Sequence, residues 1–564
     1  MFHIGFLIKL SITVLAFVLG TNWLLSSFVL DFMRDWTQVA LNQQSNVSSV
    51  RKEKESAHYR NFLIPLGFPL TTGLSLSLGY KSRNGNVCDI WNAVMEVGEG
   101  QNTIQLYNEN GQLEKFSLSR LNGLVKKILQ LEGIEKCRRI GITVPINTIQ
   151  GFVLTIAGMV RSVTHSAPIQ MLSSVPRSKI DGLDIIVIPT WKSYTRLNGS
   201  ENWYSKILIL EKQPMIENMP ANVIFWDDLV NGSLTDSKFD YTCPEDMSDD
   251  KKDLMYVTSP QNQTNRFSQM NLVSTVASCI KGFPVDHSLS EKDNLLVGAQ
   301  QSKPLESLSI WPKLFAVLLH GGSVSFLKVT DTNLNNLDGV TLASLSRQEI
   351  EVLHREILSN NTSIFDRIKK KWAETLFSEG IFTQFAKKKI SSIKNMRCIY
   401  VVNELLNADI ISSLDSSKIE SYDTATVGNV LSSKLLGDIR SEFGCRVIQE
   451  LVCPYMLMGI ISGTNYYDYR VFPENVDKLL ACFGTLETNL EAKMVEVISK
   501  KELDVTKRQG MLCIRGYSIG KPLDEERLNH ALQLSDTVGG ADGWMPLIGV
   551  FGLFGTDGCL YIYK

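Results

Sequence analysis

Short apolar runs that alternate with helical patterns constrain the fold of this chain more than any other feature. Three of the runs have the length and composition of strands: Asp184–Ile188 (DIIVI), Lys206–Leu210 (KILIL) and Arg397–Val402 (RCIYVV). Helical periodicity surrounds them, as in Ser119–Leu131 and Gln348–Leu358. This alternation is typical of α/β layers, in which helices cover the faces of sheets. We therefore predict an α/β fold.

The length of 564 residues predicts more than one folding unit. An acidic, turn-rich stretch at 244–253 separates two α/β regions, and alternating strands and Gly-rich turns after Lys493 indicate a β-rich end. The predicted units are a membrane anchor (1–35), a linker or interfacial segment (36–84), a first α/β subdomain (85–250), a second α/β subdomain (251–490) and a small β-rich subdomain (491–564).

Charge and cysteine usage exclude two classes of function. The formal net charge is −2 and the pI is about 6.4, so the chain has no global basic field for binding nucleic acid. The 10 cysteines are scattered, without a C-x-x-C pair or a histidine at ligand spacing, which argues against a structural zinc site. We expect buried free thiols in a reducing compartment and no bound metal.

An uncharged segment near the N-terminus predicts a membrane anchor. Leu10–Leu30 holds 21 residues without a charge, and a helix rising ~1.5 Å per residue would just cross a hydrocarbon core ~30 Å thick. The segment is longer than the apolar part of a cleaved signal peptide. The polar Thr21 and Asn22 near its middle leave open a hairpin in one leaflet, and a buried core helix is a third reading.

A second feature also concerns membranes. Arg367–Lys394 has two lysine triplets, Lys369–Lys371 and Lys387–Lys389, that flank aromatic and aliphatic residues. On a pair of helices these cations would meet anionic headgroups, each contributing on the order of 1 kcal/mol near a charged leaflet. The alternative is an ordinary solvated helix face.

Six N-x-Ser/Thr sequons leave open another class of protein, a glycosylated lumenal protein.

Several segments, taken in order, resemble the adenylate-forming enzymes, and among them the long-chain acyl-CoA synthetases. The resemblance covers roughly residues 85–564. It is carried by Arg138–Ile169, by HGGSVSF at His320–Phe326, by the helix that follows Leu345-Ser346-Arg347, by GMLCIRG at Gly510–Gly516 and by DGWMPLIGVFGLFGTDGCLYI at Asp542–Ile562. It implies the N-terminal domain of that superfamily, with two α/β subdomains and a small β-rich subdomain, preceded here by a hydrophobic helix.

The resemblance implies a two-step reaction, in which ATP converts a carboxylate to an acyl-adenylate and coenzyme A then takes the acyl group. The family's phosphate cradle reads like YTSGTTGxPKG, where glycines let backbone N–H groups approach the phosphates. The corresponding stretch is Tyr256–Arg266 (YVTSPQNQTNR), which lacks every glycine and the lysine. Thr258, Ser259 and Arg266 are the candidate nucleotide contacts that remain. We therefore predict that normal phosphate binding is lost.

Four further positions depart from the family pattern. By alignment with the family motifs, the gate falls on Pro304–Ser307 and the adenine cradle on Val402–Asn407, with both glycines replaced. The magnesium-binding glutamate falls on Tyr455 in Glu450–Tyr455, and a phenol is a poor ligand for a hard cation. The ribose-binding aspartate falls near Gly549. The sequence also stops at Lys564, before the family's C-terminal domain and its catalytic lysine, so we expect a degenerate member without that domain.

These losses favour a membrane-anchored pseudoenzyme without catalytic residues or metal ligands. We expect it to bind a fatty acyl or other lipid ligand, or a partner protein, in lipid metabolism. The predicted location is the endoplasmic reticulum or a lipid droplet, with the soluble domain in the cytosol and membrane lipid as a partner. The alternative is a divergent but active long-chain fatty acid-CoA ligase, which alone would need ATP and Mg²⁺ and would give acyl-CoA.

Overall fold

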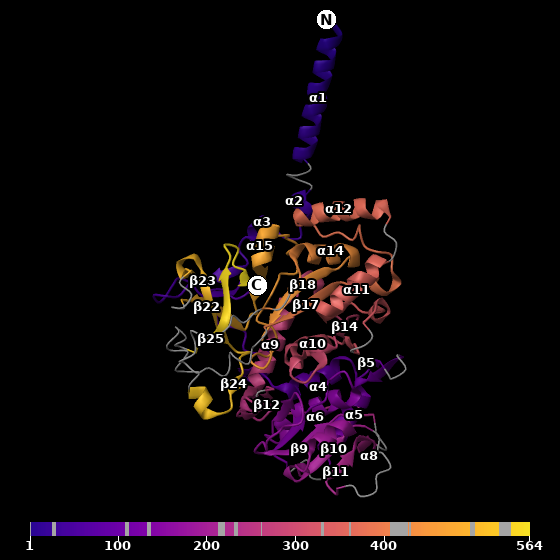
Figure 1. Cartoon of the computed structure of the whole chain (residues 1–564), viewed down its shortest axis with the longest axis vertical. Coiled ribbons are helices and arrows are strands. Elements are labelled where there is room, and N and C mark those ends of the chain that lie inside the picture. Colours follow the sequence, from indigo (N-terminus) through magenta and orange to yellow (C-terminus); the bar gives the residue numbers. More distant parts are fainter. Residues whose placement is uncertain are drawn as a thin grey trace.

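The computed structural model is a mixed α/β protein with three large sheets and a helix, α1, that projects from the body (Figure 1). The predicted α/β class is confirmed. The structure describes residues 2–24, 30–107, 112–131, 137–211, 220–230, 235–260, 262–328, 332–359, 363–405, 427, 430–496, 502–529 and 543–564.

Two of the large sheets are mainly parallel and carry the α/β layers. The eight-stranded sheet has the order β11-β10-β9-β7-β8-β12-β13-β24 and the nine-stranded sheet the order β21-β19-β18-β17-β16-β14-β15-β5-β6. The strands of the first are β7 (Arg139–Ile142), β8 (Ile169–Leu172), β9 (Leu183–Ile188), β10 (Lys206–Ile209), β11 (Val223–Phe225), β12 (Asp253–Thr258), β13 (Thr264–Ser268) and β24 (Lys521–Pro522). Those of the second are β5 (Thr103–Tyr107), β6 (Leu113–Ser117), β14 (Asn294–Val297), β15 (Ser323–Phe326), β16 (Leu342–Ser346), β17 (Cys398–Glu404), β18 (Arg446–Val452), β19 (Ser462–Gly463) and β21 (Thr485–Leu486).

The third sheet is antiparallel and has the order β1-β2-β22-β23-β25-β26-β20. Its strands are β1 (Ser45–Val47), β2 (Tyr59–Asn61), β20 (Leu480–Cys482), β22 (Leu490–Val495), β23 (Gln509–Gly516), β25 (Met545–Phe554) and β26 (Leu560–Tyr563); β3 (Leu76–Leu78) and β4 (Lys81–Arg83) form a separate hairpin. The sheets do not follow chain order. β5 and β6 precede the first sheet in the chain but join the second, and β24, late in the chain, joins the first. The predicted unit boundaries stay a prediction.

Helices cover the two α/β sheets, and several begin at a capping side chain. Thr148 accepts a hydrogen bond from the Gly151 amide at the start of α6, and Asn86 forms a capping box at the start of α4. The helices are α1 (Phe2–Leu24), α2 (Leu30–Met33), α3 (Gln38–Leu41), α4 (Val87–Val97), α5 (Leu118–Leu129), α6 (Ile149–Thr164), α7 (Trp191–Tyr194), α8 (Trp226–Val230), α9 (Gln269–Gly282), α10 (Trp311–Leu318), α11 (Arg347–Ser359), α12 (Ile364–Ser378), α14 (Ser433–Phe443) and α15 (Glu474–Leu479).

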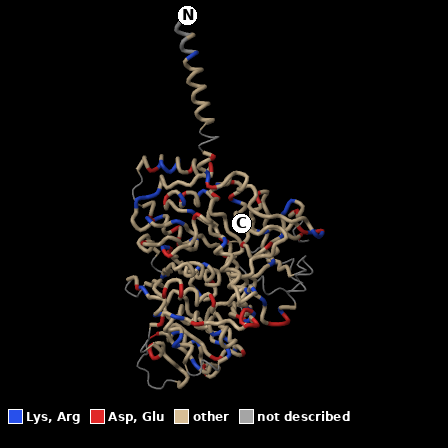
Figure 2. Tube along the Cα trace, turned by 180° about the vertical axis from the view of Figure 1, so that it is seen from behind, with Lys and Arg blue, Asp and Glu red and all other residues tan. Residues whose placement is uncertain are grey.

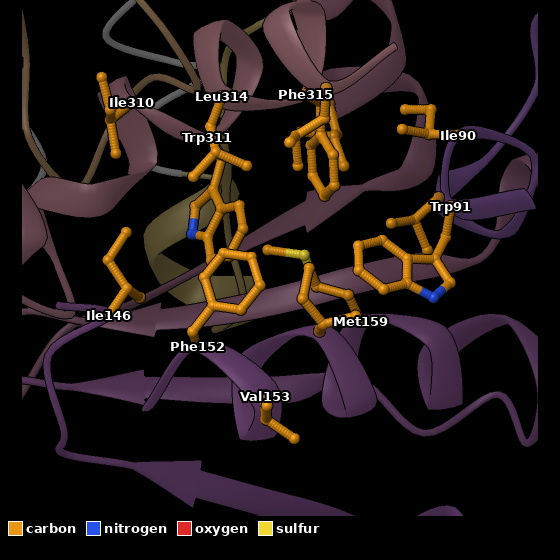
Figure 3. Close-up of a cluster of buried hydrophobic side chains, with 14 of the residues drawn as sticks. Ile90, Trp91, Ile146, Phe152, Val153, Met159, Ile310, Trp311, Leu314 and Phe315 are labelled. Carbon is orange, nitrogen blue, oxygen red and sulfur yellow. The ribbon is translucent and has the colours of Figure 1, made fainter. Parts of the chain in front are cut away.

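The largest core cluster joins the two α/β layers through α4, α6 and α10 (Figure 3). Trp91, Phe152 and Trp311 are fully buried there. The ring centroids of Phe152 and Trp311 lie 5.7 Å apart, and those of Trp311 and Phe315 lie 5.4 Å apart. Large aromatic side chains of this kind contribute strongly to a core because each buries a large apolar area. The cluster therefore fixes α10 against the first layer, and α10 carries one side of the site described below.

The N-terminal helix does not match the predicted membrane span. Within the described part of the chain, no helix combines the length and the apolar character needed to cross a membrane. α1 covers Phe2–Leu24 and includes Lys9, and residues 25–29 of the predicted span lie outside the described residues. The alternative of a buried core helix is also wrong, since the side chains of residues 9–24 are exposed. Figure 2 shows α1 standing clear of the body with little charge along it.

The basic segment forms one helix and not the predicted pair. α12 ends at Ser378, and the chain turns at Gly380, whose φ of +78° is a conformation that side-chain-bearing residues rarely adopt. The following residues, up to Lys394, form turns and one short 3₁₀ helix, Ser391–Ile393. The first lysine triplet therefore lies on a helix and the second on an irregular segment.

Candidate functional site

Thr258 and Ser259, two of the three candidates for nucleotide binding, lie where the hairpin of β12 and β13 turns. Thr258 ends β12 and pairs with Thr264 of β13. The Thr258 Oγ1 accepts a hydrogen bond from Gln170 Nε2 at 2.8 Å, and the side chain is buried. The Ser259 amide donates to the Gln263 carbonyl at 2.8 Å, and the Asn262 amide donates back to Ser259 at 2.9 Å. Backbone donors that a phosphate cradle must offer are thus used within the turn.

Arg266 lies apart from that turn, along β13. It is opposite Tyr256 of β12 on one side and Lys521 of β24 on the other. The structure therefore brings Thr258 and Ser259 together but places Arg266 along a strand inside the eight-stranded sheet. Contact of these three residues with a nucleotide stays a prediction.

The segment at the family's metal position has a different role. Glu450 on β18 is buried, and both of its carboxylate oxygens accept hydrogen bonds from Lys313 Nζ, at 2.7 and 2.8 Å. Tyr455 has a φ of +65°, and its carbonyl accepts a hydrogen bond from Asn265 Nδ2 at 2.9 Å. Among the residues that the structure describes, no group of three or more His, Cys, Asp or Glu side chains is arranged to hold a metal ion.

Two carboxylates face each other where the gate and the adenine cradle are expected. Burial raises the pKa of Glu306, on Pro304–Ser307. Burial, with a further contribution from the nearby Glu306, raises the pKa of Glu404 on β17 to about 7. The crevice that they line with Pro454 is too narrow, as bounded by the described residues, for a water molecule. Among the described residues this crevice therefore has no room for a nucleotide.

Gly549 occupies a bulge of β25. The register of β23 and β25 shifts between Met511 and Cys513, and Gly549 has a φ of +81° within the bulged stretch of β25. A glycine adopts this conformation at little cost, so the backbone geometry explains why a glycine stands at this position. It supplies no carboxylate to a ribose. At the position aligned with the family's aspartate, the strand β25 is present but the residue is a glycine.

A cavity of about 330 Å³ lies beside these segments and is the strongest candidate for a binding site. Its walls come from α9, α10, β17 and β18, from Trp36 and residues 61–63, and from the segments 459–467 and 485–488. Most of the walls are apolar or aromatic: Trp36, Phe62, Leu63, Phe283, Pro284, Val285, Pro312, Tyr400, Ile448, Ile460, Tyr466, Tyr467 and Leu486. Ligand pockets commonly combine such walls with a few fixed polar groups.

Among the polar residues of the cavity, the charged side chains are held by hydrogen bonds. Lys313 Nζ, paired with Glu450, also lies over the ring of Tyr400, 3.8 Å from its centroid. Glu487 accepts a hydrogen bond from the Ser278 hydroxyl. Burial raises the pKa of Glu487 to about 7, so near neutral pH its carboxyl is partly protonated and can donate a hydrogen bond. The cavity therefore offers one neutralised ion pair, one carboxyl group and a second ammonium, that of Lys281, which donates a hydrogen bond to Thr71 Oγ1 at 3.1 Å.

One end of the cavity reaches the surface near the base of α1. Leu63 is 42% exposed and Val285 is 91% exposed, and both line the cavity. Trp36 stacks edge-on against Phe62, with ring centroids 5.4 Å apart. Because Trp36 follows α2 closely in the chain, the opening lies on the side from which α1 projects.

Sequence reasoning missed the residues of this cavity. The signal for Lys313 was present, because it stands alone in the apolar helix WPKLFAVL. A lone cation in such a helix needs a buried partner, although the sequence does not say which. Glu487 and Tyr400 gave no comparable signal.

Comparison with known proteins supports the fold and defines a family. No model of a known protein family matches the chain. Among solved structures, a long-chain-fatty-acid-CoA ligase (FadD1) from Archaeoglobus fulgidus covers 89% of this chain and 86% of its own, with a TM-score of 0.56 and 12% identity. The N-terminal domain of FACL13 from Mycobacterium tuberculosis covers 85% of this chain and 100% of its own, with a TM-score of 0.53 and 10% identity.

The chain thus has the fold of the adenylate-forming, acyl-CoA synthetase-like enzymes, as predicted. The long-chain subtype and the absence of a C-terminal domain stay predictions. In sequence, the chain is 47% identical over 563 residues to the protein YHR045W of Saccharomyces cerevisiae, covering 99% of both chains. It belongs to the same family as that yeast protein.

Proposed function

We propose that this protein binds a fatty acyl chain in the cavity beside Lys313 and Glu450 and does not activate it with ATP. It would be a pseudoenzyme with an adenylate-forming fold. The observation that carries the proposal is a contrast between two neighbouring places. The cavity is open and mainly apolar, whereas the crevice lined by Glu306 and Glu404 has no room for a water molecule among the described residues.

The chemistry of the cavity favours a single-chain lipid. Its volume of about 330 Å³ is at the lower end of the ~300–1,000 Å³ typical of ligand pockets. The walls would bury methylene groups, each worth ~0.8 kcal/mol. Glu487, when protonated, would donate a hydrogen bond to a carboxylate or carbonyl oxygen of the ligand. A fatty acid or the acyl part of an acyl-CoA has this combination of a long apolar chain and one polar end.

The same geometry argues against ATP. Glu450, at the start of the degenerate metal motif, is already neutralised by Lys313. The backbone amides of Ser259 and Asn262 are bonded within their own turn. Phosphoryl chemistry depends almost entirely on positioned positive charge and hydrogen-bond donors, which these segments do not offer to a ligand. Neither ATP nor Mg²⁺ is part of the proposed function.

The location of the protein is part of the same proposal. α1 presents exposed apolar side chains, for example Phe17 at 73% and Trp23 at 61%. Such a surface is costly in water and favourable in the interfacial region of a lipid layer. We place α1 in one leaflet of the endoplasmic reticulum membrane or in a lipid-droplet monolayer, with the body in the cytosol. Membrane lipid would then be both partner and source of the ligand.

Gly282 offers a direct test of the ligand site. It lines the cavity, and a Cβ added there would meet no atom within 4 Å. Gly282 is exposed at the rim of the cavity, so the Gly282→Trp variant should narrow the opening and weaken binding of a fluorescent long-chain fatty acid at least tenfold. The matched control, Gly282→Ala, should bind like the wild type. Equal affinity in all three proteins would exclude this cavity as the binding site.

The fold favours one alternative, a divergent active ligase, because its structural relatives include a long-chain-fatty-acid-CoA ligase. That reading requires another subunit or an unrecognised group to supply the missing contacts. It predicts pyrophosphate release from ATP, Mg²⁺ and a fatty acid. The proposed binding function predicts none. A partner protein that docks on the body is compatible with either.

A further inference from the structure

The outer face of α12 carries a continuous apolar stripe. Ile364, Phe365, Ile368 and Trp372 are 75%, 73%, 52% and 66% exposed. At about 100° per residue, these four side chains lie within an arc of roughly 100° on one side of the helix. Isolated exposed apolar residues are common on protein surfaces, but a contiguous group of this size marks an interaction site.

The opposite face of α12 packs on the body. Ala373 and Phe377 are buried, and they form a small cluster with Ala386 and Tyr469. Lys370 also points inward, pairing with Asp438 at 3.0 Å and Glu442 at 2.9 Å on α14. The helix is therefore held by its inner face, and its outer face is not needed for the fold.

Cations border the stripe. Arg367 and Lys371 are exposed and lie beside Ile368 and Trp372 on the helix surface. Lys369 lies on the other border, with its Nζ 5.8 Å from the ring centroid of Phe385, which is 58% exposed. Of the second lysine triplet, Lys389 is exposed. Asp366 is partly neutralised by Lys388 at 3.1 Å, which leaves Glu374 as the exposed acidic group of the helix.

This face lies at the end of the molecule from which α1 projects (Figure 1). Arg34, just after α2, joins the two elements: its Nη2 pairs with Glu379 at 2.8 Å, and its Nε donates to the Glu379 carbonyl at 2.7 Å. The Asp35 amide donates to the Gly380 carbonyl at 3.1 Å. The segment that follows α2 is thus fixed to the C-terminal end of α12. Phe32 of α2 is 90% exposed at the same end of the molecule.

We infer that the outer face of α12 is a second membrane contact, which lies flat on an anionic lipid surface next to the inserted α1. The apolar stripe would enter the interfacial region, and Arg367, Lys371 and Lys389 would meet lipid phosphates. The occupant is a lipid surface because the stripe is bordered by cations and continues towards the apolar α1 and Phe32. This inference rests on the proposed membrane association and adds a preference for anionic lipid. It also holds the opening near Trp36 and Leu63 close to the lipid surface.

The test is partition of the full chain onto vesicles, measured by co-sedimentation. One set of vesicles is phosphatidylcholine and the other contains phosphatidylserine as well. The wild type should partition more strongly onto the anionic vesicles, and added salt should reduce the difference. The triple variant R367Q/K371Q/K389Q should lose on the order of 100-fold of this partition, at about fivefold per cation. The double variant Phe365→Ser/Trp372→Ser should bind both kinds of vesicle more weakly.

Controls separate this inference from the proposed function. Val97 of α4 and Leu113 of β6 are exposed at 55% and 38% away from α12, and V97S/L113S should partition like the wild type. Unchanged circular dichroism would show that the α12 variants are folded.

If the wild type binds neither kind of vesicle, the proposed membrane association fails. If it binds both equally and the α12 variants match it, only this inference is overturned. Dissociation of a wild-type dimer by Phe365→Ser/Trp372→Ser, with vesicle binding unchanged, would assign the face to a second copy of the chain and overturn lipid as its occupant.

Discussion

Removing the Lys313 ammonium tests the buried ion pair at the cavity most directly. The Lys313 and Glu450 side chains are 6% and 3% exposed, and both carboxylate oxygens accept hydrogen bonds from the one ammonium. Breaking such a pair by removing one partner leaves an uncompensated buried charge, which costs ~3–5 kcal/mol. Lys313→Met keeps most of the aliphatic stem and its packing. We therefore expect the free energy of unfolding to fall by about that amount.

The second half of this prediction concerns the double variant. Lys313→Met/Glu450→Gln removes both charges and should recover most of the lost stability, because no buried charge then remains. Urea unfolding followed by tryptophan fluorescence measures each variant. Lys478→Met is the matched control, since its pair with Glu474 is 72% and 84% exposed and such pairs are worth ~0–1 kcal/mol. A loss below ~0.5 kcal/mol for Lys313→Met, or a double variant no better than the single one, would refute the description of a shielded pair.

Three further predictions concern the carboxyl in the cavity, the anchor of α12 and the cavity wall. Folding raises the pKa of Glu487 from 4.5 to about 7, so the chain takes up a proton on folding at pH values between these two. The free energy of unfolding should therefore fall as the pH rises from 4.5 to about 7. In thermal melts at different pH, Glu487→Gln should remove part of this fall. Arg34→Ala removes the bonds to Glu379, so amide hydrogen exchange at the C-terminal end of α12 should accelerate while the core helices keep their protection. Gly282→Ala should change the thermal midpoint little or raise it, because the added methyl meets no atom within 4 Å and restricts the unfolded chain; a clear loss of stability would contradict the described space.

The regular elements could be predicted well from local patterns. The run Asp184–Ile188 lies within β9 and Arg397–Val402 overlaps β17, because buried strands read as short apolar runs whatever their neighbours. The helical patterns at Ser119–Leu131 and Gln348–Leu358 overlap α5 and α11. Pairings distant in sequence could not be predicted. Tyr59 pairs with Ala492, so β2 of the predicted linker joins the β-rich sheet, and no local signal marks such a contact.

The candidate site could be predicted only in part, for a related physical reason. Motif comparison assigned family positions to the segments of Thr258, Glu450 and Gly549, which lie on β12, β18 and β25, and that assignment stays a prediction. It could not show that Lys313, 137 residues before Glu450, neutralises that carboxylate, since the pairing depends on packing α10 against β18. Length and the absence of charge also suggested a membrane span at Leu10–Leu30, whereas no helix among the described residues is long and apolar enough to cross a membrane.

The central claim is that the chain binds an acyl ligand without activating it, and one sample can test both halves. The protein is incubated with a long-chain fatty acid, with and without ATP and Mg²⁺, and bound fatty acid and released pyrophosphate are measured together. The account predicts that fatty acid binds and raises the thermal midpoint, by ~2.7 kcal/mol of stabilisation at about 100 times the Kd, while ATP changes neither quantity and no pyrophosphate appears. Fatty-acid-dependent release of pyrophosphate would contradict it.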